Sequence, residues 1–489
     1  DLHIAPRPGT DGALACAVMH VLFRDGFADR DYMARHADAP AELEAHLLSR
    51  TPEWAAVITG LDVAEIEEFA SLYGKTDRAF IRAGYGFSRS RNGASNMHAV
   101  SCLPAVGGKW LHPGGGAIYS YGDLYRMDMT LIEGLDVLDH STRVLDMSRI
   151  GPVLTGDPSD LGGGPPVTAT LIQNTNPMAV APESALVHAG FARDDLFVCV
   201  HEQFMTETAL MADIVLPATT FLEHDDLYVS GGHSHLQIGP RVIEPLGEAR
   251  SNHDVLAGLA KRLGAQHAGF DMTAWEMIDR TLKNSGYCSA DELKARRWID
   301  CQPDFETAHF LNGFGHADGK FHFAADWAAL GPDHARLSRL PDHNAFTDES
   351  GDDHPFRLVT APARNFLNSS FTETETSRNR EGRPTAKLHP QDCAMLGVTT
   401  GDRVRIGNRR GSLVVHADVF DGLQRGVVVV EGIWPNHYFE EGVGINLLTS
   451  ADSPPPRGGA VFHDTAVWVV SAARTEDAPE MATAEIQQS

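Results

Sequence analysis

The sequence predicts an α/β protein with parallel sheets, followed by a separate β-barrel. Buried strands alternate with helices through residues 1–265, which is the pattern of parallel sheets flanked by helices. From Phe356 onward, short strands follow one another with turn residues between them, which is typical of a closed barrel. The 489 residues are enough for about three domains with a large core.

Changes in composition set the expected domain boundaries. We expect α/β domains over residues 1–125 and 126–350, and a barrel over residues 354–472. Residues 266–350 carry no motif that points to a function. Residues 473–489 are polar and low in aromatic residues, so this tail is expected to be disordered.

Charge and hydropathy narrow the classes of partner. Forty basic residues stand against sixty-six acidic ones, a formal net charge of −26, which disfavours nucleic acid and anionic membranes. No apolar run is long enough to span a bilayer. The chain starts at Asp1, inside what reads as the end of a strand (Leu2–Ala5), so we expect a fragment or a processed product. Cytoplasmic localisation is expected, and a periplasmic one stays open because the N-terminus is missing.

The six cysteines do not form a local metal motif. None belongs to a C-x-x-C pair, and the closest two, Cys288 and Cys301, are thirteen residues apart. This spacing excludes an iron–sulfur or zinc motif of the usual kind within the chain. Cys16, Cys102 and Cys199 lie in apolar segments and are expected to be core thiols.

Residues 196–223 combine two strands with a short helix. Leu196–Val200 and Ile214–Leu216 are predicted to be buried strands, and Thr206 is predicted to cap the helical turn between them. Ligands of parallel sheets bind at the carboxyl ends of the strands. Polar residues that follow these ends are therefore candidates for nucleotide contact, although the segment could also be only a sheet core; they are His201, Glu202 and His224.

Two N-terminal segments place backbone where a ligand can approach it. The turn before Gly12 leads into an apolar-faced helix that Thr10 or Asp11 can cap. The predicted strand Arg78–Gly84 is followed by a glycine-containing polar segment and then a helix, a geometry that exposes backbone N–H groups. The spacing is not G-x-G-x-x-G, so on its own it is a weak sign of dinucleotide binding.

Two further segments contain polar residues in positions that suit binding. The predicted strand Thr168–Gln173 ends in Asn-Thr-Asn-Pro, where Asn176 is held extended before proline with a free amide. His233 and His235 could be a metal pair or proton relays. Because the chain contains twenty-four histidines, solvated loop histidines are the better interpretation.

Taken together, the segments resemble one family in order along the chain. Residues 206–223 are similar to its T-E-T-A-x-x-A-D-I-V-L-P-A-x-x-x-x-E signature, residues 7–14 to R-P-G-T-D-G-A-L, and residues 84–93 to G-x-G-x-x-R-x-x-N-G. Residues 389–411 resemble its barrel. The family is the molybdenum and tungsten oxidoreductases that carry bis(molybdopterin guanine dinucleotide), the dimethyl-sulfoxide-reductase and formate-dehydrogenase class. The resemblance covers residues 1 to about 470.

The resemblance implies two doubly wound, parallel-sheet dinucleotide-binding domains and a C-terminal barrel of the double-psi type. Asn252 stands where the family usually has an aspartate that pairs with guanine, which puts that contact in doubt because an amide supplies no charge. The positions that match the family's cofactor contacts are Gly9, Thr10, Asp11, Tyr85, Arg89, Asn176, His201, Glu202, His224, Asn252, Thr360, Arg364, Asn368, Tyr438 and Asn446.

The implied activity is the two-electron transfer of an oxygen atom or a hydride equivalent to or from a small substrate, at molybdenum or tungsten. A redox partner or electron-transfer subunit is expected. The family's 4Fe-4S motif and metal ligand lie upstream of Asp1, so no residue here is named as catalytic or as a metal ligand. An alternative is a non-catalytic scaffold or electron-transfer subunit, but retention of the nucleotide-contact motifs favours the enzyme.

This reading predicts that the polypeptide as given is inactive alone. Expressed in cells that make the cofactor, it is expected to purify with little metal and no dye-linked reductase activity, because the upstream ligand segment is absent. Adding that segment in cis or as a second chain is expected to restore both. Near-stoichiometric molybdenum or tungsten with activity in the polypeptide alone would refute the prediction.

Overall fold

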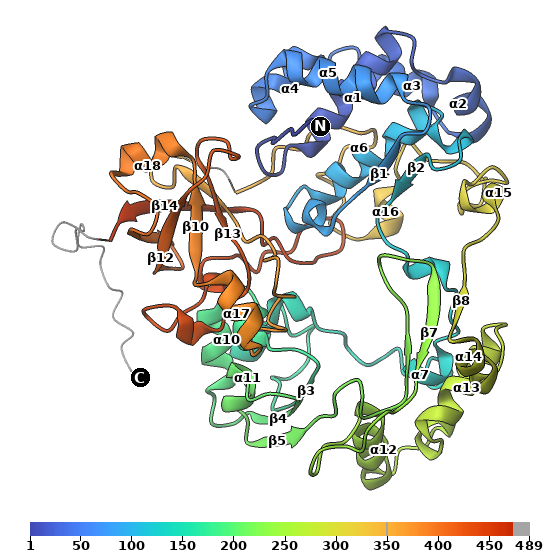
Figure 1. The fold of residues 1–489 in the computed structure, drawn as a ribbon, viewed down its shortest axis with the longest axis vertical. Helices are drawn as coiled ribbons and strands as arrows, with labels where there is room; N and C mark the ends of the chain where they lie inside the picture. Colours follow the sequence, from blue (N-terminus) through green and yellow to red (C-terminus); the bar gives the residue numbers. More distant parts are fainter. Residues whose placement is uncertain (349–350, 473–489) are drawn as a thin grey trace.

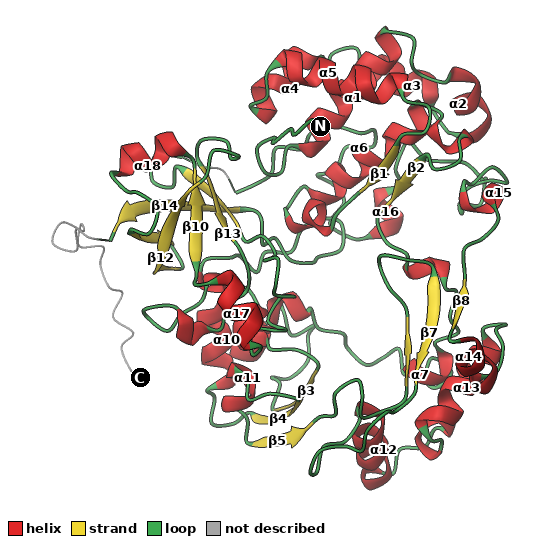
Figure 2. Ribbon diagram, in the orientation of Figure 1, coloured by secondary structure: helices red, strands yellow, loops and turns green. Residues whose placement is uncertain are grey.

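The computed structural model describes residues 1–348 and 351–472, so the predicted disordered tail lies outside the described residues (Figure 1). Two α/β units, a small antiparallel unit and a barrel make up the chain. Figure 2 shows the strands concentrated in the barrel and helices dominating the N-terminal unit. No helix among residues 1–348 and 351–472 has the length and apolar character to cross a bilayer.

The first unit is a helical layer over a two-stranded parallel sheet. Helix α1 lies at its centre, with Cys16, Val18 and Leu22 fully buried. Residues Leu2–Ala5 are not a strand, because no neighbouring strand offers them hydrogen bonds. The elements are α1 (Asp11–Arg24), α2 (Arg30–His36), α3 (Pro40–Leu47), α4 (Pro52–Thr59), α5 (Val63–Lys75), β1 (Phe80–Arg82), α6 (Gly93–Val106) and β2 (Gly116–Ile118).

The second unit contains the predicted strand–helix–strand segment, but its second strand, Ile214–Pro217, is mostly exposed and not buried as expected, because it lies at the edge of the sheet. Its three parallel strands lie in the order β3-β4-β5, with Gln173 opposite His201 and His201 opposite Leu216, so their carboxyl ends meet at one edge. Thr206 caps the short helix, as predicted, by accepting the N–H of Ala209. The elements are α8 (Ile150–Thr155), β3 (Ala169–Gln173), α9 (Pro177–Val180), α10 (Ser184–Phe191), β4 (Phe197–Glu202), α11 (Glu207–Leu210) and β5 (Ile214–Pro217).

The third unit is an antiparallel sheet with helices against it. Leu236, Leu282 and Leu293 are fully buried in its core. Helix α12 comes after β7 in the chain. It begins beside the carboxyl edge of the second unit's sheet, where Asn252 contacts Asn174. The elements are α7 (Thr130–Glu133), β6 (Asp226–Tyr228), β7 (His235–Gly239), α12 (Asn252–Leu263), α13 (Ala274–Asn284), α14 (Ala290–Arg296) and β8 (Trp298–Asp300).

The segment from 303 to 347 returns to the first unit. It carries α15 (Phe305–Ala308) and α16 (Trp327–Leu330), and its Phe323 is buried in the core around α1. We expected one α/β domain over 126–350, whereas the structure divides this range among three packing units. The division was not visible in the sequence because the returning segment buries few apolar residues and has no periodic pattern.

The C-terminal part is a closed six-stranded barrel, as predicted. The strands close in the order β10-β12-β11-β14-β9-β13, with β13 paired to β10. Two pairs are parallel, β10 with β12 and β9 with β13. The elements are β9 (Phe356–Val359), α17 (Glu375–Glu381), β10 (Thr385–Leu388), α18 (Pro390–Leu396), β11 (Arg403–Asn408), β12 (Gly411–Val419), β13 (Val427–Val430) and β14 (Thr465–Ser471).

The returning segment is attached to the first unit partly by charge. Burial alone would raise the pKa of Asp342, but hydrogen bonds from His46 and Arg50 hold this pKa at about 2. A carboxyl pKa that is lower in the folded state stabilises the fold above the ordinary value of 3.8 and loses that contribution as the pH falls towards 2. Near neutral pH the contribution is about 1–2 kcal/mol after screening.

We therefore predict that Asp342→Asn lowers the free energy of unfolding at pH 7 but changes it little near pH 2. Denaturant unfolding across this pH range measures the difference. Glu42→Gln is the control, because Glu42 pairs with Arg339 of the same segment but both side chains are exposed. An equal loss in Asp342→Asn at pH 7 and pH 2 would contradict the assignment.

Candidate functional site

A cavity of about 270 Å³ lies where the first unit meets the barrel. Four segments that are distant in the sequence form its walls: the turn before α1, the loop after β1, the end of one barrel strand at Val359, and the residues before the last barrel strand at His463. We call it the Asp11 cavity, and its lining residues are Pro8, Gly9, Asp11, Gly84, Gly86, Ser90, Val359 and His463.

Asp11 is the main polar group of this cavity. It is the first residue of α1, and burial raises the pKa of its carboxyl while its own backbone N–H lowers it. Among the described residues, no side chain accounts for any part of that shift. A buried acceptor that has no side-chain partner is costly, so this carboxylate is suited to receive donors from a ligand in the cavity.

The loop after β1 is fixed against α1 by two asparagines. Asn92 Nδ2 donates to the Gly9 carbonyl at 2.7 Å, and Asn96 Oδ1 accepts the Gly12 N–H at 3.0 Å. The side chain of Asn96 in turn donates to Asn92 Oδ1 at 3.1 Å. The turn containing Gly9 and the loop containing Gly86 are thereby held together on either side of the cavity.

A buried ion network holds the barrel side of the cavity. The Asp464 side chain is 0% exposed, and its Oδ2 accepts the Arg91 N–H at 3.0 Å while Arg91 Nη1 lies 3.0 Å from the same atom. Its other oxygen, Oδ1, accepts from Arg357 Nη1 and from the Asp348 N–H. The adjacent His463 therefore has a fixed position at the cavity wall.

Two basic side chains lie at or near the cavity, His463 in its wall and Arg89 close to His463. Burial lowers the pKa of His463, and the positive charge of nearby Arg89 lowers it further. The backbone N–H of His463 donates to the backbone carbonyl of Arg89 at 2.9 Å. His463 is thus a neutral group at neutral pH, and Arg89 supplies the cation beside the cavity.

A second polar edge forms at the carboxyl ends of β3, β4 and β5. Gln173 Nε2 donates to His201 Nδ1 at 3.0 Å, so the His201 Nε2–H donates to the Arg250 carbonyl at 3.1 Å. Asn252 Nδ2 donates to Asn174 Oδ1 at 3.1 Å, and Asn174 has a left-handed backbone with φ of 59°. Helix α12 starts here, so its N-terminal N–H groups lie at the same edge.

Four other predicted contacts are occupied within the protein. The Asn176 amide bonds Glu207 and Thr208, and Asn446 Nδ2 donates to the Ala179 carbonyl at 2.8 Å, which joins the barrel to the second unit. The Glu202 carboxylate accepts the backbone N–H of Gln203, and the His224 ring is hydrogen-bonded to the Thr219 hydroxyl at 2.7 Å. None of the four lines the Asp11 cavity.

The remaining predicted residues lie around the barrel or at the cavity margin. Thr10 bonds the Arg7 carbonyl, and Thr360, next to Val359, donates to the Phe462 carbonyl at 3.1 Å. Arg364, Asn368, Tyr438 and Tyr85 are exposed. The structure thus brings Gly9, Asp11 and the loop of Tyr85 and Arg89 together, gathers His201 and Asn252 at a second edge, and does not unite all fifteen in one cavity.

Sequence reasoning missed Ser90, Val359 and His463, which line the cavity, and Asp464, which positions one of them. The available signal was a pair of polar residues, His463-Asp464, directly before an apolar strand. Within residues 1–348 and 351–472, no three His, Cys, Asp or Glu side chains are grouped as metal ligands.

The buried network yields a stability prediction. Asp464→Asn leaves Arg357 buried without a carboxylate and leaves Arg91 with only the half-exposed Asp452, so we expect the free energy of unfolding to fall by about 3 kcal/mol in denaturant titrations. Asp25→Asn removes an exposed partner of Arg24 and serves as the matched control, with a much smaller effect. A loss in Asp464→Asn no larger than in the control would show that the network does not hold the two units together.

The chain is similar to characterised families over nearly its whole length. The model "Molybdopterin oxidoreductase" matches residues 1–262, and "Molydopterin dinucleotide binding domain" matches residues 356–466. A probable oxidoreductase, YoaE of Bacillus subtilis, is 33% identical over 96% of this chain and 68% of its own length. A trimethylamine-N-oxide reductase of Haemophilus influenzae is 26% identical over 88% of this chain and 59% of its own.

A solved structure has the same fold. Acetylene hydratase from Pelobacter acetylenicus superimposes with a TM-score of 0.77 and 19% identity, covering 95% of this chain and 71% of that one. These matches confirm the resemblance on which the sequence analysis relied. The chain spans 59–68% of the length of the two curated relatives. With a family model over more than half of its residues and a relative at 33% identity, the chain belongs to the molybdopterin oxidoreductases of the dimethyl-sulfoxide-reductase family.

Proposed function

We propose that this chain binds bis(molybdopterin guanine dinucleotide) and forms most of the catalytic subunit of a molybdenum or tungsten oxidoreductase. The reaction would move an oxygen atom or a hydride equivalent, with two electrons, to or from a small substrate. Support comes from the two family models and from the names of the relatives, one of which is a trimethylamine-N-oxide reductase. Electrons would pass to or from a redox partner, which would be another chain or a further segment of this protein.

The observation that carries this proposal is the Asp11 carboxylate. Guanine presents two donors, the N1–H and the N2 amino group, on one edge of its ring, and a carboxylate can accept both at once. Asp11 is half-buried, has no side-chain partner that accounts for its raised pKa, and lines a cavity of about 270 Å³. The residues present therefore fit a guanine at this position.

The phosphates of a dinucleotide also find suitable groups nearby. Gly84 and Gly86 present backbone without side chains at the cavity wall, and Arg89 supplies a cation. At the second edge, the N-terminus of α12 offers N–H groups and a favourable dipole to an anion. Asn252 can bond a base edge there, without the charge that an aspartate would supply.

The bound cofactor would supply the two-electron chemistry. The protein's own contribution is to bind, orient and shield. Asp11 would orient one guanine, the Asn92–Asn96 pair would hold the loop after β1 against it, and neutral His463 would donate or accept a hydrogen bond at the cavity wall. His201 keeps the carboxyl edge of the second sheet in place through its two ring nitrogens.

We predict that the chain binds GDP at least tenfold more tightly than inosine diphosphate, because inosine lacks the N2 amino group. In Asp11→Asn, this preference is expected to disappear. Asp31→Asn is the matched control, since Asp31 also lies in the first turn of a helix but is exposed. Isothermal titration calorimetry measures the affinities of the unmodified chain and both variants for the two nucleotides. A retained preference in Asp11→Asn would refute the role of Asp11.

The same carboxyl predicts a pH dependence. Burial raises the pKa of Asp11, so the carboxyl takes up a proton at a higher pH than an exposed aspartate does. A protonated carboxyl no longer accepts both guanine donors, and GDP affinity is expected to fall as the pH decreases through this raised pKa. Titrations between pH 8 and pH 4 are expected to show the decrease in the unmodified chain and a flat profile in Asp11→Asn.

A further inference from the structure

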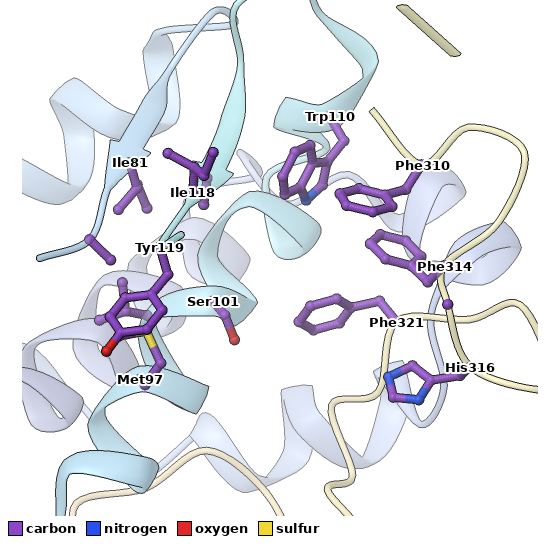
Figure 3. Close-up of a pocket in the computed structure, with 14 residues that line it drawn as sticks. Ile81, Met97, Ser101, Trp110, Ile118, Tyr119, Phe310, Phe314, His316 and Phe321 are labelled. Atoms are coloured by element: carbon purple, nitrogen blue, oxygen red, sulfur yellow. The ribbon is translucent and has the colours of Figure 1, made fainter. Parts of the chain in front are cut away.

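A second cavity, of about 300 Å³, lies against the sheet of the first unit (Figure 3). Ile81 of β1 and Ile118 of β2 form one wall, and Met97 of α6 lies beneath them. The opposite wall comes from Trp110 of the first unit and from the segment that returns from the third unit. We call it the aromatic cavity. Its volume is at the lower end of the range of small-molecule sites.

The opposite wall is a series of four aromatic rings. Trp110 meets Phe310 edge to face with centroids 5.1 Å apart, and Phe310 stacks on Phe314 at 4.9 Å with an interplanar angle of 13°. Phe314 meets Phe321 edge to face at 5.4 Å. Figure 3 shows these rings across an open space from Ile81, Ile118 and Tyr119. Ring edges and faces presented in this way suit a further aromatic ring.

No residue that lines the aromatic cavity carries a permanent charge. None of its fourteen residues is Asp, Glu, Lys or Arg, and its polar groups are the side chains of Ser101, Tyr119 and His316 and the indole N–H of Trp110. The Ser101 hydroxyl donates to the His98 carbonyl at 2.8 Å, so its oxygen is left as an acceptor. An ionised ligand would lose its hydration here without a partner, whereas an uncharged apolar one would not.

The aromatic cavity is adjacent to the Asp11 cavity. Ala83 lines the first and the next residue, Gly84, lines the second, so the end of β1 separates them. Tyr119 also lines the aromatic cavity, and its ring meets Tyr85 of the loop after β1 at 4.8 Å. Its hydroxyl is hydrogen-bonded to Ser88 of that loop at 3.1 Å. A molecule in the aromatic cavity is therefore in reach of the loop that would hold the cofactor.

We propose that the aromatic cavity binds the aryl group of an uncharged substrate, which extends from it over the Tyr119–Tyr85 pair towards the cofactor. This inference rests on the proposed function for the identity of the reacting centre, but the binding site itself does not require cofactor. The ring series provides the contact area, and the absence of Asp, Glu, Lys and Arg selects against ionised ligands.

The test compares three small probes on the full chain by ligand-observed NMR. Methyl phenyl sulfoxide carries an uncharged aryl group, dimethyl sulfoxide lacks the ring, and benzoate has the ring with a charge. Methyl phenyl sulfoxide is expected to bind at least tenfold more tightly than either of the others. Similar affinities for all three would overturn the proposal.

Variants locate the binding. Phe314→Ala removes one of the two middle rings of the series, and Ser101→Leu fills part of the cavity from α6. Each variant is expected to lower the affinity for methyl phenyl sulfoxide at least fivefold. Phe221→Ala is the matched control, because Phe221 is 65% exposed and does not line the cavity. Thermal melting by circular dichroism confirms that each variant is folded. Unchanged binding in both cavity variants would overturn the proposal.

The outcome is separable from that of the proposed function. GDP binding without an aryl preference would overturn this inference alone. An aryl preference that the two cavity variants abolish, in a chain that does not bind GDP, would refute the nucleotide assignment and leave the aryl site supported.

Discussion

The site depends on one buried carboxylate. Asp464 is fully enclosed and receives Arg91 from the first unit and Arg357 from the first barrel strand. Because each arginine would be costly to bury without it, the two units are held at one relative position wherever this network is intact. The position matters, since the Asp11 cavity has walls from both units. A displacement of the barrel would move Val359 and His463 away from Gly9 and Asp11 and open the cavity to water.

The sequence was informative where physical constraints are local. Strands of the second unit and the barrel were recognisable because β-branched runs end at turn residues, and the carboxyl end of β4 contains His201 and Glu202, which the sequence placed at the end of that strand. Contacts between distant segments were not recognisable. Nothing local in Asp464 reveals that two arginines, 373 and 107 residues away, meet it, and nothing local in Asn176 or Asn446 reveals that their amides are used within the protein.

The two cavities show how one strand end can serve two chemistries. Side chains alternate along a strand, so consecutive residues face opposite sides. At the end of β1, Ala83 faces the aromatic cavity and Gly84 adjoins the Asp11 cavity. One is polar, with a carboxylate, a cation and bare backbone, and the other is apolar and ring-lined. Groups with opposite solvation requirements can thereby be held within one loop of each other, with the Tyr85–Tyr119 contact between them.

The net charge of the chain affects which ligands can approach it. At −26, the chain repels anions at long range, yet the proposed cofactor is itself highly anionic. Long-range repulsion is screened within about 8 Å at physiological ionic strength, so a cofactor bound as proposed, beside Arg89, glycine N–H groups and the α12 N-terminus, would gain local interactions that offset this repulsion. A small anionic substrate that must diffuse in has no such set of contacts in the aromatic cavity, whose lining holds no arginine or lysine. The same charge distribution therefore permits tight binding of an anionic cofactor and favours an uncharged substrate.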